Sequence, residues 1–382
     1  MEKLTLRNLG PIKEAELTFG DLTVLVGPQA SGKSIAVQML KLCEDRRAIH
    51  EQMTLYGLDW HQRWGEFFDA FLGEGMRHIW RESSAVQWNG ADQTRESLAK
   101  KSGRGGAAER VFLVPAQRVL AIADGWPKPF QAFRSGDPFV VRDFSDKLRL
   151  LVEEFGEKAI FPQKNRLKAE FRSMIESALF GGFSLEVDTY KSQRRLVLRE
   201  QGQEGLPAMV WSAGQREFVP LLLGLYWLMP AAKVTRRQDI EWVIVEEPEM
   251  GLHPRAIMTT MLMVLELLKR DYRVVLSTHS PIVLECVWLI RQLQEHGAVP
   301  DRILEAFGCK KTQGFREVAE AVMGKNMRVY SFGRDERVRD ISSLDPGAAE
   351  LAESQWGGLA EFSERAGDAV ASAVLDSGRG LK

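Results

Sequence analysis

One segment near the N-terminus has the composition and spacing of a phosphate-binding loop. It comprises Gly27, Pro28, Gln29, Ala30, Ser31, Gly32, Lys33 and Ser34 and fits the pattern G-x-x-x-x-G-K-[ST]. In this pattern the glycines let backbone N–H groups close around phosphate oxygens, and the lysine reaches the β- and γ-phosphates. The hydroxyl that follows the lysine ligates Mg²⁺, and a helix that begins there adds its dipole. The segment therefore predicts a nucleoside triphosphate site.

Two adjacent carboxylates provide the next candidate. Glu246 and Glu247 follow the apolar residues 243–245. Ligands of open α/β sheets bind at the carboxyl ends of strands, where neighbouring side chains point in different directions. Glu246 is thus a candidate for the Mg²⁺ shell, and Glu247 is a candidate general base that orients an attacking water. Taken alone, two acids after a strand are more often a solvated strand end.

Two further segments are candidates for phosphate binding because of the strand or helix that each adjoins. His279 follows the apolar strand 274–278, one helix after Glu247, and is a candidate for sensing or stabilising a γ-phosphate. Residues 212–216, SAGQR, open an apolar helix, so that their amides and the Ser212 hydroxyl form a second anion-binding end. A histidine at a strand end is usually a satisfied polar group, and SAGQR alone is an ordinary helix cap.

The elements that must position these residues alternate along the chain. A buried strand ends at the glycine loop and a helix follows. Another buried strand is expected at 111–115, and strands alternate with helices over 242–284. This alternation predicts an α/β fold with a mixed, largely parallel sheet covered on both faces. We expect a core of residues 1–117 and 212–300 with an aromatic-rich helical insert at about 44–110, an inserted helical and hairpin subdomain at 118–211, and a helical region of unknown role at 301–382.

The aromatic residues between 44 and 110 allow two interpretations. They are Trp60, Trp64, Phe67, Phe68, Phe71, Trp80 and Trp88. A surface on which nucleic-acid bases stack is one, but aromatic residues at this spacing more often form a helical core. We therefore expect them to be buried.

Composition narrows the class of protein. Of 382 residues, 45% are hydrophobic and 27% are charged, which is typical of a folded, soluble chain. Fifty-one basic and 52 acidic residues leave no global basic field, so binding to DNA would need a local patch such as 164–168 or 194–195. Three cysteines without CxxC spacing, and an N-terminus without an apolar run, predict a cytoplasmic protein with no membrane association.

Taken together, the motifs resemble those of ATP-binding-cassette-type ATPases, in the branch that contains RecF, SMC and OLD (overcoming-lysogenization-defect) proteins. The resemblance covers residues 1–42, 111–118, 212–228 and 243–284, and EEPEMGLHP followed by THSP is most similar to OLD-like ATPases of bacterial defence. It implies a P-loop NTPase fold with ATP and Mg²⁺ as ligands. It also implies that Lys33 and Ser34 belong to the Walker A motif, Glu246 and Glu247 to Walker B, and that His279 is the switch histidine.

The resemblance also implies roles for two less regular segments. Ser212, Gly214 and Gln215 match the signature motif, which in this family contacts the γ-phosphate bound to the opposite subunit. Gln117 matches the glutamine that binds nucleotide and metal, with Arg118 as a neighbouring candidate. The signature reads SAGQR rather than the LSGGQ of transporters, and no DxD cluster follows His279. Transporter and Toprim nuclease chemistry are therefore disfavoured.

A dimer follows from the physical chemistry of the site as well. A P-loop leaves the γ-phosphate half exposed, whereas phosphoryl transfer needs donors on several sides. We expect ATP to join two chains head to tail in a homodimer, or in a higher homo-oligomer. The leading hypothesis is an ATPase switch that controls a separate effector, a nuclease or toxin, in anti-phage defence or DNA surveillance. A DNA-end-binding repair ATPase and the ATPase subunit of a membrane transporter remain as alternatives.

Overall fold

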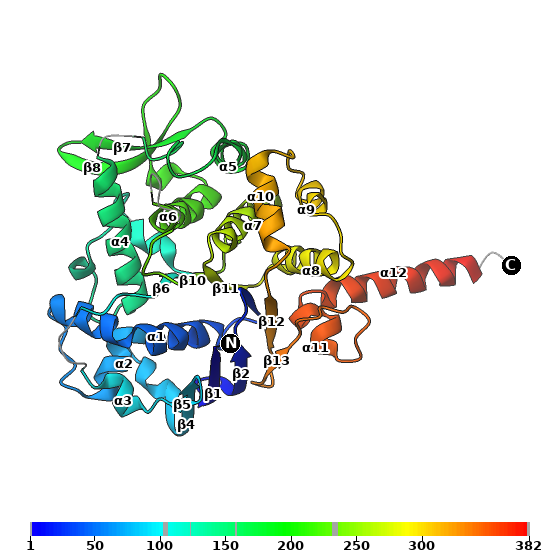
Figure 1. The fold of residues 1–382 in the computed structure, drawn as a ribbon, viewed down its shortest axis with the longest axis horizontal. Coiled ribbons are helices and arrows are strands. Elements are labelled where there is room, and N and C mark those ends of the chain that lie inside the picture. Colours follow the sequence, from blue (N-terminus) through cyan, green and yellow to red (C-terminus); the bar gives the residue numbers. More distant parts are fainter. Residues whose placement is uncertain (1, 102–105, 123, 157–158, 231–235, 380–382) are drawn as a thin grey trace.

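A six-stranded sheet forms the centre of the molecule. The computed structural model describes residues 2–101, 106–122, 124–156, 159–230 and 236–379 (Figure 1). Across the sheet the strands are β13 (Val338–Asp340), β12 (Met327–Phe332), β3 (Leu22–Val26), β11 (Arg273–Thr278), β10 (Trp242–Glu246) and β6 (Val111–Val114). Every neighbouring pair is parallel except β12 and β13. The predicted mixed, largely parallel sheet is confirmed.

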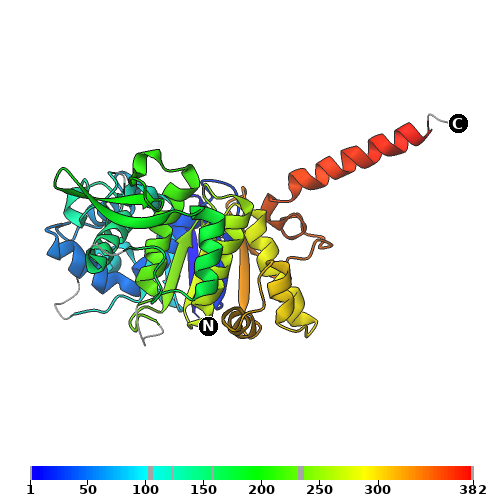
Figure 2. The same cartoon turned by 90° about the horizontal axis from the view of Figure 1, so that it is seen from above.

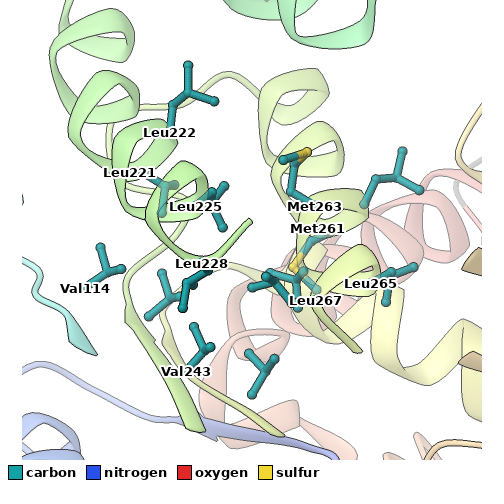
Figure 3. Close-up of a cluster of buried hydrophobic side chains, with 14 of the residues drawn as sticks. Val114, Leu221, Leu222, Leu225, Leu228, Val243, Met261, Met263, Leu265 and Leu267 are labelled. Atoms are coloured by element: carbon teal, nitrogen blue, oxygen red, sulfur yellow. The ribbon is translucent and has the colours of Figure 1, made fainter. Parts of the chain in front are cut away.

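Both faces of this sheet are buried, because alternate side chains of its strands enter two different hydrophobic cores. On β10, Val243 and Val245 face one core, whereas Trp242 and Ile244 face the other. Helices α4 (Phe139–Phe155), α6 (Ala213–Leu228), α7 (Pro254–Lys269) and α8 (Pro281–Glu295) contribute to the first core. Figure 3 shows part of it, where leucines of α6 and methionines and leucines of α7 gather with Val114 and Val243 of the sheet. Near-continuous apolar strands are typical of such two-sided burial.

The second core lies under a smaller antiparallel sheet. This sheet has the order β2 (Ile12–Thr18), β1 (Lys3–Leu9), β4 (Trp80–Trp88) and β5 (Ala91–Asp92), and it packs with α1 (Lys33–Leu55), α2 (Trp64–Leu72) and α3 (Arg95–Ala99). Most of the aromatic residues of this region are buried there, as expected. The helical description of residues 44–110 needs one correction, because β4 is a strand that pairs with β1. Its period of two, with Trp80, Val86 and Trp88 buried, explains why it pairs.

The segment between β6 and α6 holds the elements that the sequence predicts. Helix α4 is followed by α5 (Ala169–Ile175), which continues into a π-helical turn at Glu176–Phe180. Strands β7 (Ser184–Tyr190) and β8 (Gln193–Arg199) form the predicted hairpin, and β9 (Leu206–Pro207) joins it. These elements lie at one end of the molecule in Figure 1. The division of the chain into a core and an inserted subdomain stays a prediction.

The C-terminal region contains more than the helices that the sequence indicates. It holds α9 (Asp301–Ala306), α10 (Gln313–Val322), α11 (Leu351–Ser354) and α12 (Glu361–Arg379), and α12 projects from the body (Figure 2). The helical description of residues 301–382 is corrected by β12 and β13, because β12 pairs with β3 inside the central sheet. The six residues of β12 are too few for their periodicity to distinguish a strand from a helix. In the part of the chain that the structure describes, no helix is long and apolar enough to cross a membrane.

A buried cluster of charges ties α1 to α4. Lys41, which is 1% exposed, binds Asp45 at 3.2 Å, Glu109 at 2.7 Å and the Val111 carbonyl at 2.7 Å. Lys147 of α4 binds the same Glu109 oxygen. Burial opposes ionisation of Glu109, but Lys147 and Lys41 outweigh it and lower its pKa from 4.5 to about 2. Glu109 therefore contributes stability above its unfolded pKa, and this contribution is lost as the pH falls towards 2.

We expect Lys41→Met to lower the free energy of unfolding by about 3–5 kcal/mol, because it leaves the buried Asp45 carboxylate without its ammonium partner. Urea unfolding at pH 7, followed by circular dichroism, measures this change. The matched control is Lys3→Met, which removes an exposed ion pair with Glu16 and should cost less than about 1 kcal/mol. Equal effects of the two substitutions would contradict the structural role of the buried cluster.

Candidate functional site

The glycine-rich loop connects β3 to α1 and is shaped by two close contacts. Gly27 has φ 143°, and a Cβ there would lie 2.3 Å from the carbonyl oxygen of Phe332 on β12. Gly32 has φ 100°, and a Cβ there would lie 2.5 Å from Ile12. Both positions therefore require glycine. The loop is held between the C-terminal strand β12 and the β1–β2 hairpin, at the N-terminal end of a 23-residue helix.

Lys33 lies in this loop with its ammonium group turned onto backbone carbonyls. Its Nζ donates to the carbonyl oxygens of Gly27 and Pro28, both at 2.8 Å. Burial lowers the pKa of Lys33 to about 8, against the attraction of Glu247, Glu249 and Glu246. The ammonium is thus desolvated. On binding, the phosphate oxygens of a triphosphate would replace those carbonyl oxygens as its hydrogen-bond acceptors.

Glu246 ends β10 as a buried carboxylate with an incomplete set of partners. It is 2% exposed, and burial raises its pKa, whereas contact with the Ser34 hydroxyl and the Ala116 N–H lowers it. Its Oε2 accepts from Ala116 at 3.4 Å, while its Oε1 is buried without a partner among the described residues. A hydroxyl beside an unpartnered carboxylate oxygen fits the few protein ligands that Mg²⁺ takes at phosphate sites. The residues present therefore fit the ion.

Glu247 adopts a backbone conformation that is rare for a side-chain-bearing residue. Its φ is 45°, and its N–H donates to the Ser277 carbonyl at 2.8 Å. The turn directs its carboxylate towards His279, whose Nε2 lies 3.6 Å from Glu247 Oε1. Burial and the Lys33 ammonium lower the pKa of His279, although Glu247 and Glu249 oppose them. The two side chains lie close together because β11 is the neighbour of β10 in the sheet.

Glu249 is a residue of the site that the sequence analysis did not identify. Its Oε1 accepts from the Thr278 hydroxyl at 2.8 Å and from the His279 N–H at 2.6 Å, so it joins the loop after β10 to the end of β11. Its other oxygen is buried without a partner in the described part of the chain. The sequence does carry a signal for Glu249, because it is the third acid of the segment EEPE at residues 246–249. Glu249 positions His279 rather than facing the cavity.

Arg118 also has a larger part in the site than its sequence neighbour Gln117. The Arg118 side chain is fully buried and donates to the carbonyls of Glu246 at 3.0 Å, Glu247 at 3.1 Å and Glu217 at 3.1 Å. It also pairs with the Glu217 carboxylate at 3.5 Å. Gln117 is exposed at the end of β6 and is not part of the described cavity lining. Arg118 thus ties the strained turn at Glu247 to helix α6.

The segment 212–216 forms the N-terminus of α6. Ser212 accepts from the Gln215 N–H at 3.2 Å, and the Gln215 side chain accepts from the Ser212 N–H at 3.0 Å, which is a capping box. The amides of Ala213 and Gly214 have no intrahelical acceptor, as in any first turn. Gly214 packs against the loop after Glu249, where a Cβ would lie 3.2 Å from the Gly251 carbonyl.

The predicted residues of the P-loop, Glu247 and His279 meet around one cavity of about 410 Å³. Its lining includes residues 29–34, Glu247, Ser277 and His279. Ser212, Gly214 and Gln215 are absent from the described lining, although all three lie on the same chain. One chain therefore brings together the residues for phosphate binding and water activation, while its signature segment lies elsewhere.

A P-loop at the end of β3, with acids at the end of β10 and a histidine on the strand between them, defines an ABC-type P-loop NTPase. Residues 22–285, more than half of the chain, match the family described as "AAA domain, putative AbiEii toxin, Type IV TA system". The chain belongs to this family. No curated protein matches it.

Solved structures of SMC heads are similar to the chain at low identity. The SMC head domain from Thermotoga maritima is 15% identical, with 74% of this chain and 90% of that chain covered and a TM-score of 0.32. An SMC head bound to the C-terminal winged-helix domain of ScpA is 12% identical, with 88% and 95% covered and a TM-score of 0.42. An Smc head with an extended coiled coil, bound to the C-terminal domain of ScpA derived from Pyrococcus furiosus, is 14% identical, with 89% and 96% covered and a TM-score of 0.33.

We expect the affinity for ATP to fall as the pH rises above about 8. Free Lys33 has a pKa of about 8, and the negative charge of a bound triphosphate raises it, so binding above pH 8 takes up a proton. Affinity then falls by up to about tenfold per pH unit. Titration calorimetry at pH 7 and pH 9, in buffers with different ionisation enthalpies, measures the proton uptake. Lys33→Arg, which stays charged, is the control, and equal uptake at both pH values would refute the assignment.

We also expect Arg118→Lys to lower the turnover number without changing ATP affinity, because an ammonium cannot span three carbonyls. A small displacement of Glu247 should slow turnover on the order of 10–100-fold. Steady-state kinetics and calorimetry separate the two quantities. The control is Arg110→Lys, an ion-paired arginine that bridges Glu44 and Glu241 away from the cavity. A change in affinity alone would show that Arg118 does not position Glu247.

Proposed function

We propose that this chain is an ATPase switch that binds ATP with Mg²⁺, dimerises around it and hydrolyses it to ADP and phosphate. One observation carries the proposal. The Glu247 carboxylate and the His279 ring face the cavity that also contains Lys33 and Ser34. A general base opposite a phosphate-binding loop is the arrangement that hydrolysis of a phosphoanhydride needs.

Each residue then has a definite task. The loop amides and Lys33 hold the β- and γ-phosphates, and Glu247 accepts a proton from the attacking water. The water oxygen bonds to the γ-phosphorus, and the bond from that phosphorus to the bridging oxygen breaks, which leaves ADP and phosphate. His279, whose pKa is lowered, acts as a neutral hydrogen-bonding partner of the γ-phosphate. Ser34 and Glu246 would hold Mg²⁺, which supplies neutralisation of phosphate charge when bound.

The proposed dimer rests on what a single cavity lacks. In the described structure the cavity has donors from the loop on one side and Glu247 with His279 on another, and the signature segment is not in its lining. The first-turn amides of Ala213 and Gly214 point out of α6 without intrahelical acceptors. A second chain placed head to tail would bring these amides to the γ-phosphate. ATP would then close two composite sites, and hydrolysis would open them.

Control of a separate effector is the biological role that we propose. The description of the family names a toxin and a toxin–antitoxin system, which supports a defence role. The basic residues considered for DNA binding are mostly engaged inside the chain. Arg166 donates to the Tyr226 carbonyl at 2.7 Å, Lys168 pairs with Glu317 at 2.6 Å, and Arg195 pairs with Asp188 at 2.9 Å. These contacts favour the switch over a DNA-end-binding ATPase.

Mixing two inactive variants tests the composite site. Lys33→Met disables the nucleotide half and Ser212→Arg disables the signature half, so each homodimer should be inactive. In a mixed head-to-tail dimer, one site carries both changes and the other carries neither. We therefore expect equimolar mixing to restore about a quarter of wild-type turnover, since half of the dimers are mixed and each has one intact site of two. A phosphate-release assay measures it.

The control mixture combines Lys33→Met with Glu247→Gln. Because Lys33 and Glu247 act in the same half, both sites of that mixed dimer stay defective and mixing should restore nothing. Glu247→Gln alone should bind ATP, turn over slowly and accumulate as dimer in light scattering. Failure of the first mixture to regain activity would argue against a composite site, and normal turnover of Glu247→Gln would remove Glu247 from its role.

A further inference from the structure

A second cavity adjoins the phosphate-binding cavity on the other side of the P-loop. It has a volume of about 480 Å³ and shares Pro11, Gln29, Ala30 and Ser31 with the first. Its far wall is the turn between β12 and β13, where Gly333, Arg334 and Glu336 line it. Both volumes lie within the usual range for small-molecule sites. The two cavities therefore adjoin each other along these shared residues of the P-loop.

The β12–β13 turn is fixed to the site by contacts on both sides. On one side the Phe332 carbonyl lies so close to Gly27 that no side chain fits between them. On the other side the Lys13 N–H donates to the Glu336 carbonyl at 2.8 Å, and the two side chains pair at 3.2 Å. The turn is thus a built wall of the cavity, although it is more than 300 residues from the P-loop in sequence.

Of the cations on this turn, Arg334 is the one in the described lining of the cavity. Asp335 pairs with Arg339, and Glu336 pairs with Lys13. Arg334 is exposed, lines the cavity and has no ion pair or hydrogen bond to any residue that the structure describes. Pro11 and Pro28 provide the apolar surface beside it. A planar guanidinium next to apolar walls is suited to stacking on a flat ring.

The direction of phosphoryl transfer places the nucleoside on this side. Attack on the γ-phosphorus proceeds in line, so the water and the leaving β-phosphate lie on opposite sides of it. Glu247 and His279 mark the water side in the first cavity. The remainder of the nucleotide must therefore extend away from them. The second cavity adjoins the first across the P-loop residues that the two share, and its lining contains neither Glu247 nor His279.

We propose that the second cavity binds the nucleoside of ATP and that the Arg334 guanidinium stacks on the face of its base. This inference rests on the proposed function and extends it, because it assigns a ligand-binding role to the C-terminal β12–β13 hairpin. Stacking of this kind depends on a flat, polarisable ring and not on the pattern of donors along its edge. The same contact therefore serves ADP, which keeps the base and lacks the γ-phosphate.

The test compares nucleotide with phosphate chain alone. Titration calorimetry of the full-length protein with ATP, ADP and inorganic tripolyphosphate, each with Mg²⁺, is carried out on wild type, Arg334→Ala, Arg334→Tyr and Arg337→Ala. Arg334→Ala should weaken ATP and ADP binding about tenfold and leave tripolyphosphate unchanged. Arg334→Tyr should keep the affinity for both nucleotides, because a phenol ring also stacks. Arg337 is exposed on the same hairpin but outside the cavity, so its substitution should change nothing.

The possible failures are distinguishable. Equal weakening of ATP and tripolyphosphate by Arg334→Ala would place the guanidinium on phosphate and overturn the stacking contact. Unchanged ATP affinity in Arg334→Ala would overturn the whole assignment of the hairpin while leaving the ATPase proposal intact. A wild-type protein that binds tripolyphosphate and ATP equally well would remove the nucleoside from the second cavity. A wild type that binds neither would overturn the proposed function itself.

Discussion

The crowding of three carboxylates at one strand end is the constraint on which the site depends. Glu246, Glu247 and Glu249 lie within four residues, and like charges so close together repel each other. Lys33 and Arg118 offset this repulsion from two different elements, and burial lowers the pKa of each cation even though the glutamates attract it. The acids thus offset part of the cost of burying each cation. The P-loop, the end of β6 and the loop after β10 therefore stabilise one another, and the charged site is also a structural junction.

The same junction explains how a strained residue can be held in place. A non-glycine residue in the left-handed region costs on the order of 1–3 kcal/mol and persists only when its surroundings fix it. At Glu247 the surroundings do so from two sides, because its N–H is bound to Ser277 and its carbonyl to Arg118. The strained conformation sets the direction of the Glu247 side chain. The turn takes Glu247 out of the strand's alternation and aims its carboxylate at the cavity, while Glu246 stays buried beside Ser34.

The sequence predicted the parts of the site that are local and missed those that depend on long-range packing. The P-loop, the strand before Glu246 and the strand before His279 each carry their signal within a short window. Arg118 was only a neighbouring candidate, because its partners lie about 100 and 130 residues away. Strand β12 was missed because six residues are too few to show a distinctive period, and the role of Glu249 depends on the register of β10 with β11. Arg334 could not be identified from the sequence, because only the fold brings its turn next to the P-loop.

The contacts within one chain also suggest how two sites in the proposed dimer would communicate. Glu249 fixes the backbone of His279 at one end of its loop, and Gly251 of the same loop packs on α6 at the other. Arg118 adds a second link from α6, through Glu217, to the carbonyl of Glu247. If the N-terminus of α6 contacts ATP held by the partner, any shift of that helix reaches both Glu247 and His279 of its own chain. Coupling of this kind is reciprocal, so nucleotide in either site would favour the catalytic arrangement in the other.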